Sequence, residues 1–183
     1  MKPEIIYIHG AVAIDYDAKT DQLLNQLKDR TDPEISIHTP RMANPIDQIG
    51  WLDALDAMIH KLDSAIILIG HSLGASTILK YLSERAIENP IESIHLFATP
   101  FWKNNGWQSD YALSGGAISR LKKYPDIHLY HCEDDEGVPY EHLLKYLSVI
   151  PHASAHKLKK GGHYFTSGIP NSKVQITQSI NHS

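Results

Sequence analysis

The hydrophobic and polar positions of the chain fall into two alternating patterns. In the first, apolar and β-branched residues follow one another in short runs bounded by turn-forming residues, as in a strand that is buried on both faces. In the second, apolar residues recur at intervals of three or four, as on the inner face of a helix. Runs of the first kind predict strands at residues 5–8, 35–38, 65–69, 91–98, 127–132 and 153–158.

Segments with the helical pattern lie between these strands, and one of them has a clear expected start. Asn44 is a suitable N-cap and Pro45 fits the first turn, so we expect a helix from there to about Lys61. Its apolar stripe begins at Ile49, and we interpret Trp51 near its edge as a packing residue. Further helices are predicted before the second strand, after the third, within residues 101–124, after Pro139 and from about Ser172 onward.

Strands that alternate with helices are typical of a parallel sheet with helices on both faces. The sequence therefore predicts an α/β fold, a three-layer α/β/α sandwich around a mostly parallel six-stranded sheet. The 183 residues show no internal repeat, linker or low-complexity segment, so we expect one domain over residues 1–183. In such sheets, ligands bind outside the carboxyl ends of the strands.

One of these strand ends carries the sequence Gly-His-Ser-Leu-Gly at residues 70–74. It follows an apolar run and precedes a helical segment, which is the strand, sharp turn and helix of a nucleophile elbow. Glycine is needed on both sides because the turn brings the backbones of strand and helix close together. The pattern predicts that Ser72 stands at the apex of the turn as a nucleophile.

A serine hydroxyl needs a base within hydrogen-bond reach, and an imidazole oriented by a carboxylate meets this need. His163 follows the last predicted strand after two glycines and is the candidate base. Asp134 and Asp135 both follow the fifth strand. We favour Asp135 because it begins an Asp-x-x-Val-Pro turn, and we interpret Asp134 as a turn former. The order Ser72, Asp135, His163 is that of the α/β-hydrolases.

Acyl transfer also needs hydrogen-bond donors for the oxyanion that develops on the substrate carbonyl. The backbone N–H of Leu73, at the start of the helix after the serine, is one candidate. The second donor is expected in the loop after the first strand, where we assign the N–H of Ala11.

Several aromatic residues are candidates for a substrate pocket. Phe101, Trp102 and Trp107 lie after the fourth strand, where α/β-hydrolases usually carry a lid. His9 lies at the end of the first strand. These rings either wall an acyl or alcohol pocket or only cover the edge of the sheet, and the sequence favours neither reading.

These motifs together resemble the small single-domain α/β-hydrolase-fold serine hydrolases related to YdeN and to the retinoblastoma-binding serine hydrolase. The matching pieces are the first strand, the Met-x-x-Pro stretch before Trp51, Gly-His-Ser-Leu-Gly, the Asp-Asp-x-x-Val-Pro turn and Gly-Gly-His. The resemblance implies a reduced hydrolase fold without the usual first two antiparallel strands and without a large cap. It also implies hydrolysis of small esters by Ser72, Asp135 and His163. Some members of the family are discussed as protein-binding modules.

Composition narrows the function. The formal net charge of −4 and the pI of about 6.3 offer no broad basic surface for phosphates, so nucleic acid is not an expected partner. The single cysteine, Cys132, lies in a predicted strand and is expected to be a buried, inert thiol. No apolar run has the length of a signal peptide or membrane span, so we expect a cytoplasmic protein that does not bind a membrane.

Metal and nucleotide chemistry are not expected either. His128 and His131 would point to opposite faces of a strand, and the sequence has no His-Glu-x-x-His or paired-cysteine pattern. It also has neither a P-loop nor Gly-x-Gly-x-x-Gly. The sequence thus predicts a cofactor-free serine hydrolase acting on small carboxylic esters or related acyl compounds. The alternatives are acyl transfer to a nucleophile other than water, and a protein-interaction module on a hydrolase scaffold.

Overall fold

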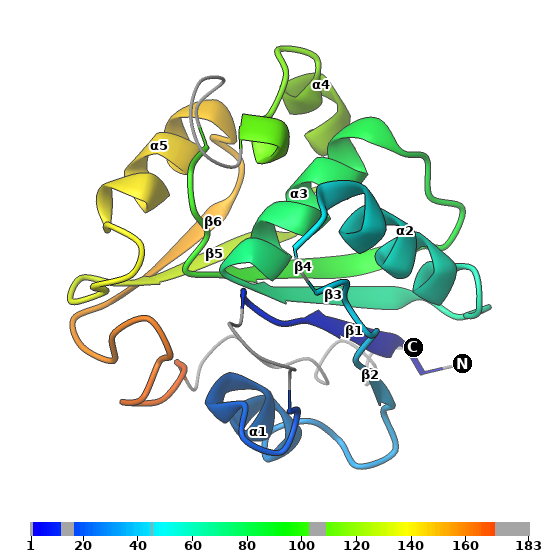
Figure 1. The fold of residues 1–183 in the computed structure, drawn as a ribbon, viewed down its shortest axis with the longest axis horizontal. Helices are drawn as coiled ribbons and strands as arrows, with labels where there is room; N and C mark the ends of the chain where they lie inside the picture. The colour runs from blue at the N-terminus through cyan, green and yellow to red at the C-terminus, as the bar shows by residue number, and fades with distance from the viewer. Residues whose placement is uncertain (1, 12–16, 45, 103–108, 171–183) are drawn as a thin grey trace.

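The computed structural model describes residues 2–11, 17–44, 46–102 and 109–170, and Figure 1 shows how they are arranged. Six strands form one parallel sheet in the order β2-β1-β3-β4-β5-β6. The strands are β1 (Glu4–Ile8), β2 (Ile37–His38), β3 (Ile66–His71), β4 (Ile91–Phe97), β5 (Ile127–Cys132) and β6 (Ser154–Leu158). The strand order reverses direction between β1 and β3, so a ligand is expected near their carboxyl ends.

Helices cover both faces of this sheet. On one face lie α2 (Gln48–Ile59), α3 (Leu73–Glu84), α4 (Ala117–Leu121) and α5 (Glu141–Val149), and on the other lies α1 (Gln22–Lys28) (Figure 1). Each face has its own hydrophobic core. The three-layer α/β/α sandwich around a six-stranded sheet is therefore confirmed.

The strand β1 shows why the predicted strands are almost continuous apolar runs. Ile6 and Ile8 belong to the core beneath α2 and α3, whereas Ile5 and Tyr7 belong to the core beneath α1. All four side chains are at most 1% exposed. Successive side chains of a strand point to opposite faces, so a strand that is covered on both sides needs apolar residues at every position.

The helix α2 begins later than the sequence predicted. Its N-cap is Asp47, whose carboxylate accepts the N–H groups of Ile49 and Gly50 at 3.3 and 2.9 Å, so the expected cap at Asn44 was wrong. A carboxylate in this position also interacts favourably with the positive end of the helix dipole. Ile49, which was expected on the inner face, is 63% exposed, whereas Trp51 is buried and packs against the core as expected.

Other predicted elements are shorter than expected or lie outside the residues that the structure describes. Of the predicted strand 35–38, only Ile37 and His38 pair with β1. Between β4 and β5, the described residues form a 3-10 turn η1 (Ser109–Tyr111) and α4, without a large cap. The helix expected from Ser172 lies outside the described residues. None of the described helices combines the length and the apolar character that a membrane crossing requires.

Candidate active site

The turn between β3 and α3 holds Ser72 in an unusual backbone conformation. Its φ is 51° and its ψ is −116°, outside the regions that residues with a side chain normally occupy. Neighbours hold it there: the Ser72 N–H donates to the carbonyl of Phe97 at 2.8 Å, and its carbonyl accepts the N–H of Ser76 at 3.2 Å. A residue held in this way at the end of a central strand is typical of a nucleophile elbow.

The two glycines of the motif lie where other backbone comes closest. A Cβ atom on Gly70 would lie 2.6 Å from Cα of Ala75, and a Cβ atom on Gly74 would collide with the carbonyl oxygens of Ile8 and His9. Both positions therefore need glycine for space. The collision at Gly74 also means that the start of α3 lies directly against the end of β1, so the ends of the first and third strands meet.

The Asp135 carboxylate is buried after β5 and faces the ring of His163. Its oxygens lie 3.1 and 3.0 Å from Nδ1 of His163, and Oδ1 also accepts the N–H groups of Gly137 and Val138, each at 2.8 Å. Burial by itself raises the pKa of Asp135. The hydrogen bonds from His163 and the two amides outweigh that effect, and the pKa lies below its ordinary value. The carboxylate is thus ionised at neutral pH and accepts Nδ1–H of His163.

The neighbouring carboxylate has a different environment. Asp134 accepts the N–H groups of Gly161 and Gly162 at 3.2 and 2.9 Å, and so fixes the loop that carries His163. The φ values of these glycines are 137° and 57°, which residues with a side chain rarely adopt. Asp135 therefore contacts the imidazole, and Asp134 supports the loop beneath it.

A second histidine connects this loop to the elbow. His71 donates from Nε2–H to the backbone carbonyl of His163 at 2.8 Å, and the two rings lie 4.8 Å apart. Burial and the nearby His163 lower the pKa of His71 to about 4, so its ring is neutral at neutral pH. Within the described part of the chain, no hydrogen bond joins Ser72 Oγ to the His163 ring. Such bonds often form only when substrate binds.

The predicted oxyanion donors lie at the same corner of the sheet. Leu73 is the first residue of α3, where backbone N–H groups have no partner within the helix. Ala11 follows Gly10, which packs against the elbow, because a Cβ atom on Gly10 would lie 3.2 Å from Cβ of Ser72. The roles of these two amides stay predictions.

The predicted aromatic residues after β4 have packing partners. Phe101 meets Tyr146 edge-on, with ring centroids 5.0 Å apart, and Trp102 donates from Nε1–H to Ser76 Oγ at 2.8 Å. Trp107 lies outside the described residues. A part for these three side chains in substrate binding stays a prediction.

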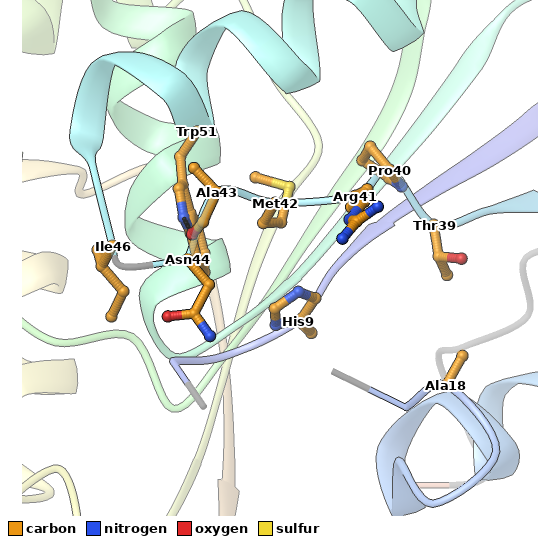
Figure 2. Close-up of a pocket in the computed structure, with 10 residues that line it drawn as sticks. All are labelled: His9, Ala18, Thr39, Pro40, Arg41, Met42, Ala43, Asn44, Ile46 and Trp51. Atoms are coloured by element: carbon orange, nitrogen blue, oxygen red, sulfur yellow. Dashed lines mark hydrogen bonds between the residues drawn. The ribbon is translucent and has the colours of Figure 1, made fainter. Parts of the chain in front are cut away.

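A pocket of about 400 Å³ opens beside the end of β1 (Figure 2). His9 forms one wall, and the segment 39–44 between β2 and α2 forms another. The predicted part of His9 in substrate binding stays a prediction. Trp51 joins them: its Nε1–H donates to the carbonyl of Ala43 at 2.8 Å, and its ring meets His9 edge-on at 5.4 Å. Segment 39–44 was not predicted to line a site.

The family to which the chain belongs follows from a match over most of its length. The model of the serine hydrolase family matches residues 18–167. The chain belongs to the serine hydrolase family. The matched range contains the elbow, both aspartates and His163 of this serine hydrolase.

Solved structures with a similar fold support the same architecture. The ydeN gene product from B. subtilis has a TM-score of 0.75 at 22% identity, with 92% of this chain and 93% of that chain covered. A protein described as a YdeN-like hydrolase, from Pectobacterium atrosepticum, has a TM-score of 0.68 at 15% identity, with 96% and 87% covered. At these identities the likeness shows the α/β-hydrolase fold, which confirms the expected fold class. No curated protein matches the chain.

Sequence reasoning missed two residues that support the turn of Asp135 and its contact with His163. A Cβ atom on Gly137 would lie 3.1 Å from Cγ of His163, so glycine leaves room for the imidazole. His131 donates from Nε2–H to the carbonyl of Val138 at 2.8 Å, and the same nitrogen lies 3.5 Å from Oδ2 of Asp135. Burial lowers the pKa of His131, so its ring braces the turn in the neutral form.

His128, considered above as a metal ligand, and Cys132, considered as a thiol, are both engaged by or buried among neighbouring residues. His128 lies on the face of β5 opposite His131, with Nδ1 2.9 Å from Nε2 of His156. Cys132 is buried, and burial raises the pKa of its thiol to about 12. Because the thiolate is the reactive form, Cys132 is an unsuitable nucleophile.

Proposed function

We propose that this serine hydrolase cleaves small carboxylic esters or related acyl compounds through a covalent acyl-enzyme. The supporting observation is the pairing of the ionised Asp135 with Nδ1 of His163, on a loop that His71 links to the elbow. With Nδ1–H engaged, the imidazole has Nε2 available as the acceptor for a serine proton.

In the proposed mechanism, Ser72 Oγ attacks the acyl carbon while Nε2 of His163 takes its proton. Asp135 stabilises the imidazolium, and the N–H groups of Leu73 and Ala11 donate to the oxyanion. The ester C–O bond then breaks, the alcohol leaves with the proton from His163, and the acyl group stays on Ser72. Water, deprotonated by the same imidazole, then attacks the acyl carbon. The bond from that carbon to Ser72 Oγ breaks, Oγ takes the proton back from His163, and the carboxylic acid is released.

A fluorophosphonate probe tests this proposal, because it phosphonylates only an activated serine. We expect the wild-type protein and a Ser148→Ala control, altered at an exposed serine, to be labelled equally. We expect Ser72→Ala to be folded and unlabelled. Wild-type protein that is folded but not labelled would contradict the proposal and favour the protein-interaction module.

Acyl-chain preference and the nature of the acyl acceptor are tested separately. With p-nitrophenyl esters of increasing acyl length, we expect short chains to be preferred, since the pocket beside β1 holds about 400 Å³. Products formed in the presence of added alcohols distinguish hydrolysis from acyl transfer: free acid supports hydrolysis, and a new ester as the main product supports a transferase.

A further inference from the structure

Among the described residues that line the pocket beside β1, one carries a charge, and it is a cation. Arg41 comes from the segment between β2 and α2, and Figure 2 shows its guanidinium on the side that faces His9. Its side chain is exposed, and within the described part of the chain no ion pair or hydrogen bond engages it. The guanidinium group has a planar set of N–H donors that matches a carboxylate. Arg41 is therefore available to an anionic ligand.

The described residues that line the pocket with Arg41 contribute no opposing charge. The described lining contains neither Asp nor Glu. His9 donates from Nδ1–H to the carbonyl of Gly10 at 2.5 Å, and burial lowers its pKa, so its ring is neutral at neutral pH. The side chains of Thr39 and Asn44 add a hydroxyl and an amide to the same wall. The described residues that line the pocket thus carry a net positive charge, in a chain whose formal net charge is −4.

The rest of the pocket is apolar. Met42 and Trp51 are 8% and 1% exposed and form a firm wall, and Ile46 extends it toward α2. An apolar wall with one guanidinium matches a ligand in which a short hydrocarbon stem ends in a carboxylate. A volume of about 400 Å³ is within the range of small-molecule sites.

The pocket and the elbow meet at the end of β1. His9 lines the pocket, and the next residue, Gly10, packs on Ser72, where an added Cβ atom would lie 3.2 Å from Cβ of the serine. Ala11, the assigned second oxyanion donor, follows directly. A substrate whose carbonyl lies at the elbow therefore has the pocket beside it, across the end of one strand.

We propose that Arg41 binds a second, free carboxylate of the substrate, so that the preferred substrates are monoesters of short dicarboxylic acids. The reaction itself rests on the function proposed above, in which the ester bond is hydrolysed at Ser72. Binding of the carboxylate needs only the pocket, so the two proposals can fail separately.

The first experiment measures selectivity. The p-nitrophenyl monoesters of glutaric and adipic acid are compared with the neutral p-nitrophenyl pentanoate and hexanoate, after subtraction of spontaneous hydrolysis. We expect kcat/KM of the wild type to favour the anionic esters, and the ratio of anionic to neutral kcat/KM to fall about tenfold or more in Arg41→Gln. Arg41→Lys should retain part of the preference, because it keeps the charge but loses the planar donor set.

Lys61→Gln is the matched control, since it removes the same charge from an exposed residue beyond the end of α2. We expect this variant to keep the wild-type ratio. Wild-type hydrolysis of the neutral esters with no preference for the anionic ones would overturn the inference and leave the proposed function intact. The same conclusion would follow if Arg41→Gln kept the wild-type ratio.

The second experiment measures binding without turnover. Monomethyl adipate and the neutral methyl hexanoate are titrated by calorimetry into Ser72→Ala and into the Ser72→Ala, Arg41→Gln double variant. We expect Ser72→Ala to bind monomethyl adipate, and we expect the affinity to fall about tenfold or more in the double variant. Such binding would support the pocket even if the wild type hydrolysed no ester. Absence of binding to Ser72→Ala would overturn the inference even if neutral esters were hydrolysed.

Discussion

Replacing Asp135 with Asn changes one carboxylate oxygen to an NH2 group and keeps the shape of the side chain. Oδ1 accepts the N–H groups of Gly137 and Val138, so the amide oxygen must stay in that position. The NH2 group then takes the place of Oδ2, which lies 3.0 Å from Nδ1 of His163. An NH2 group can only donate, and Oδ1, 3.1 Å from Nδ1, already accepts the two backbone N–H groups. Nδ1 is therefore expected to accept from the NH2 group, and the ring proton moves to Nε2.

This tautomer of His163 lacks an acceptor for the proton of Ser72. The corresponding change in a serine-protease triad lowers kcat about 10⁴-fold, and we expect a loss of the same order here. In free energy this is about 5 kcal/mol of transition-state stabilisation. The fold should be retained, because both backbone hydrogen bonds to the residue 135 oxygen survive. We therefore expect the thermal midpoint to stay close to that of the wild type.

The assay is kcat with a short p-nitrophenyl ester, together with the rate of fluorophosphonate labelling. Asp134→Asn is the matched control, since it makes the same chemical change one residue earlier, where the side chain accepts N–H groups of Gly161 and Gly162. Each of its oxygens accepts one of these N–H groups, so the amide keeps one hydrogen bond and loses the other. Asp134 does not contact the His163 ring, so the ring keeps its tautomer and the loss of kcat should stay below about tenfold. The reasoning is refuted if Asp134→Asn is the more damaging change, or if Asp135→Asn keeps more than about a tenth of kcat.

Two predictions concern stability. His71 takes up a proton near pH 6.5 when unfolded but near pH 4 when folded, so stability that is present above pH 6.5 is lost as the pH falls toward 4. Protonation of this group lowers the free energy of unfolding by about 2 kcal/mol at pH 5. Between pH 7.5 and pH 5, urea unfolding should therefore show a smaller loss of stability in His71→Gln than in the wild type. An equal loss would show that His71 is not the group responsible. Gly74→Ala drives a Cβ atom into the carbonyls of Ile8 and His9 and should cost about 1–3 kcal/mol, seen as a lower thermal midpoint. Gly116→Ala, where an added Cβ atom meets nothing within 4 Å, is the control, and equal midpoints for both variants would contradict the close approach at the elbow.

The bounds of a helix or strand could be predicted from the sequence where the burial of its side chains alone determines them. The strand β5 has the predicted bounds 127–132, because both of its faces are covered and turn residues end it. The start of α2 could not be predicted in this way, since Asn44 and Asp47 are both suitable caps. In the structure, Trp51 Nε1–H donates to the carbonyl of Ala43, which lies in the non-helical segment before Asp47.

The same distinction applies to the site. Ser72, Asp135 and His163 could be proposed from sequence because the ends of parallel strands converge at one edge of the sheet. The hydrogen bond from His71 to the His163 carbonyl joins residues 92 positions apart, and no local pattern encodes it. The pocket wall at residues 39–44 has no periodicity, and its position depends on where Trp51 packs.

The Asp135 carboxylate and the Arg41 guanidinium lie on opposite sides of the elbow in the order of the strands. This separation predicts how the loss of each group affects KM and kcat. Asp135 and His163 follow β5 and β6, whereas Arg41 follows β2, with the β3 elbow between them in the sheet order. A contact between Arg41 and a remote carboxylate is present both in the enzyme–substrate complex and in the transition state, so its loss should raise KM more than it lowers kcat. In the proposed mechanism, Asp135 stabilises a charge that exists only once His163 has taken the proton, so the loss of Asp135 should lower kcat. An Arg41→Gln variant that changes kcat alone would mean that the guanidinium acts on the reacting bond, and the pocket would then have to be placed at the elbow itself.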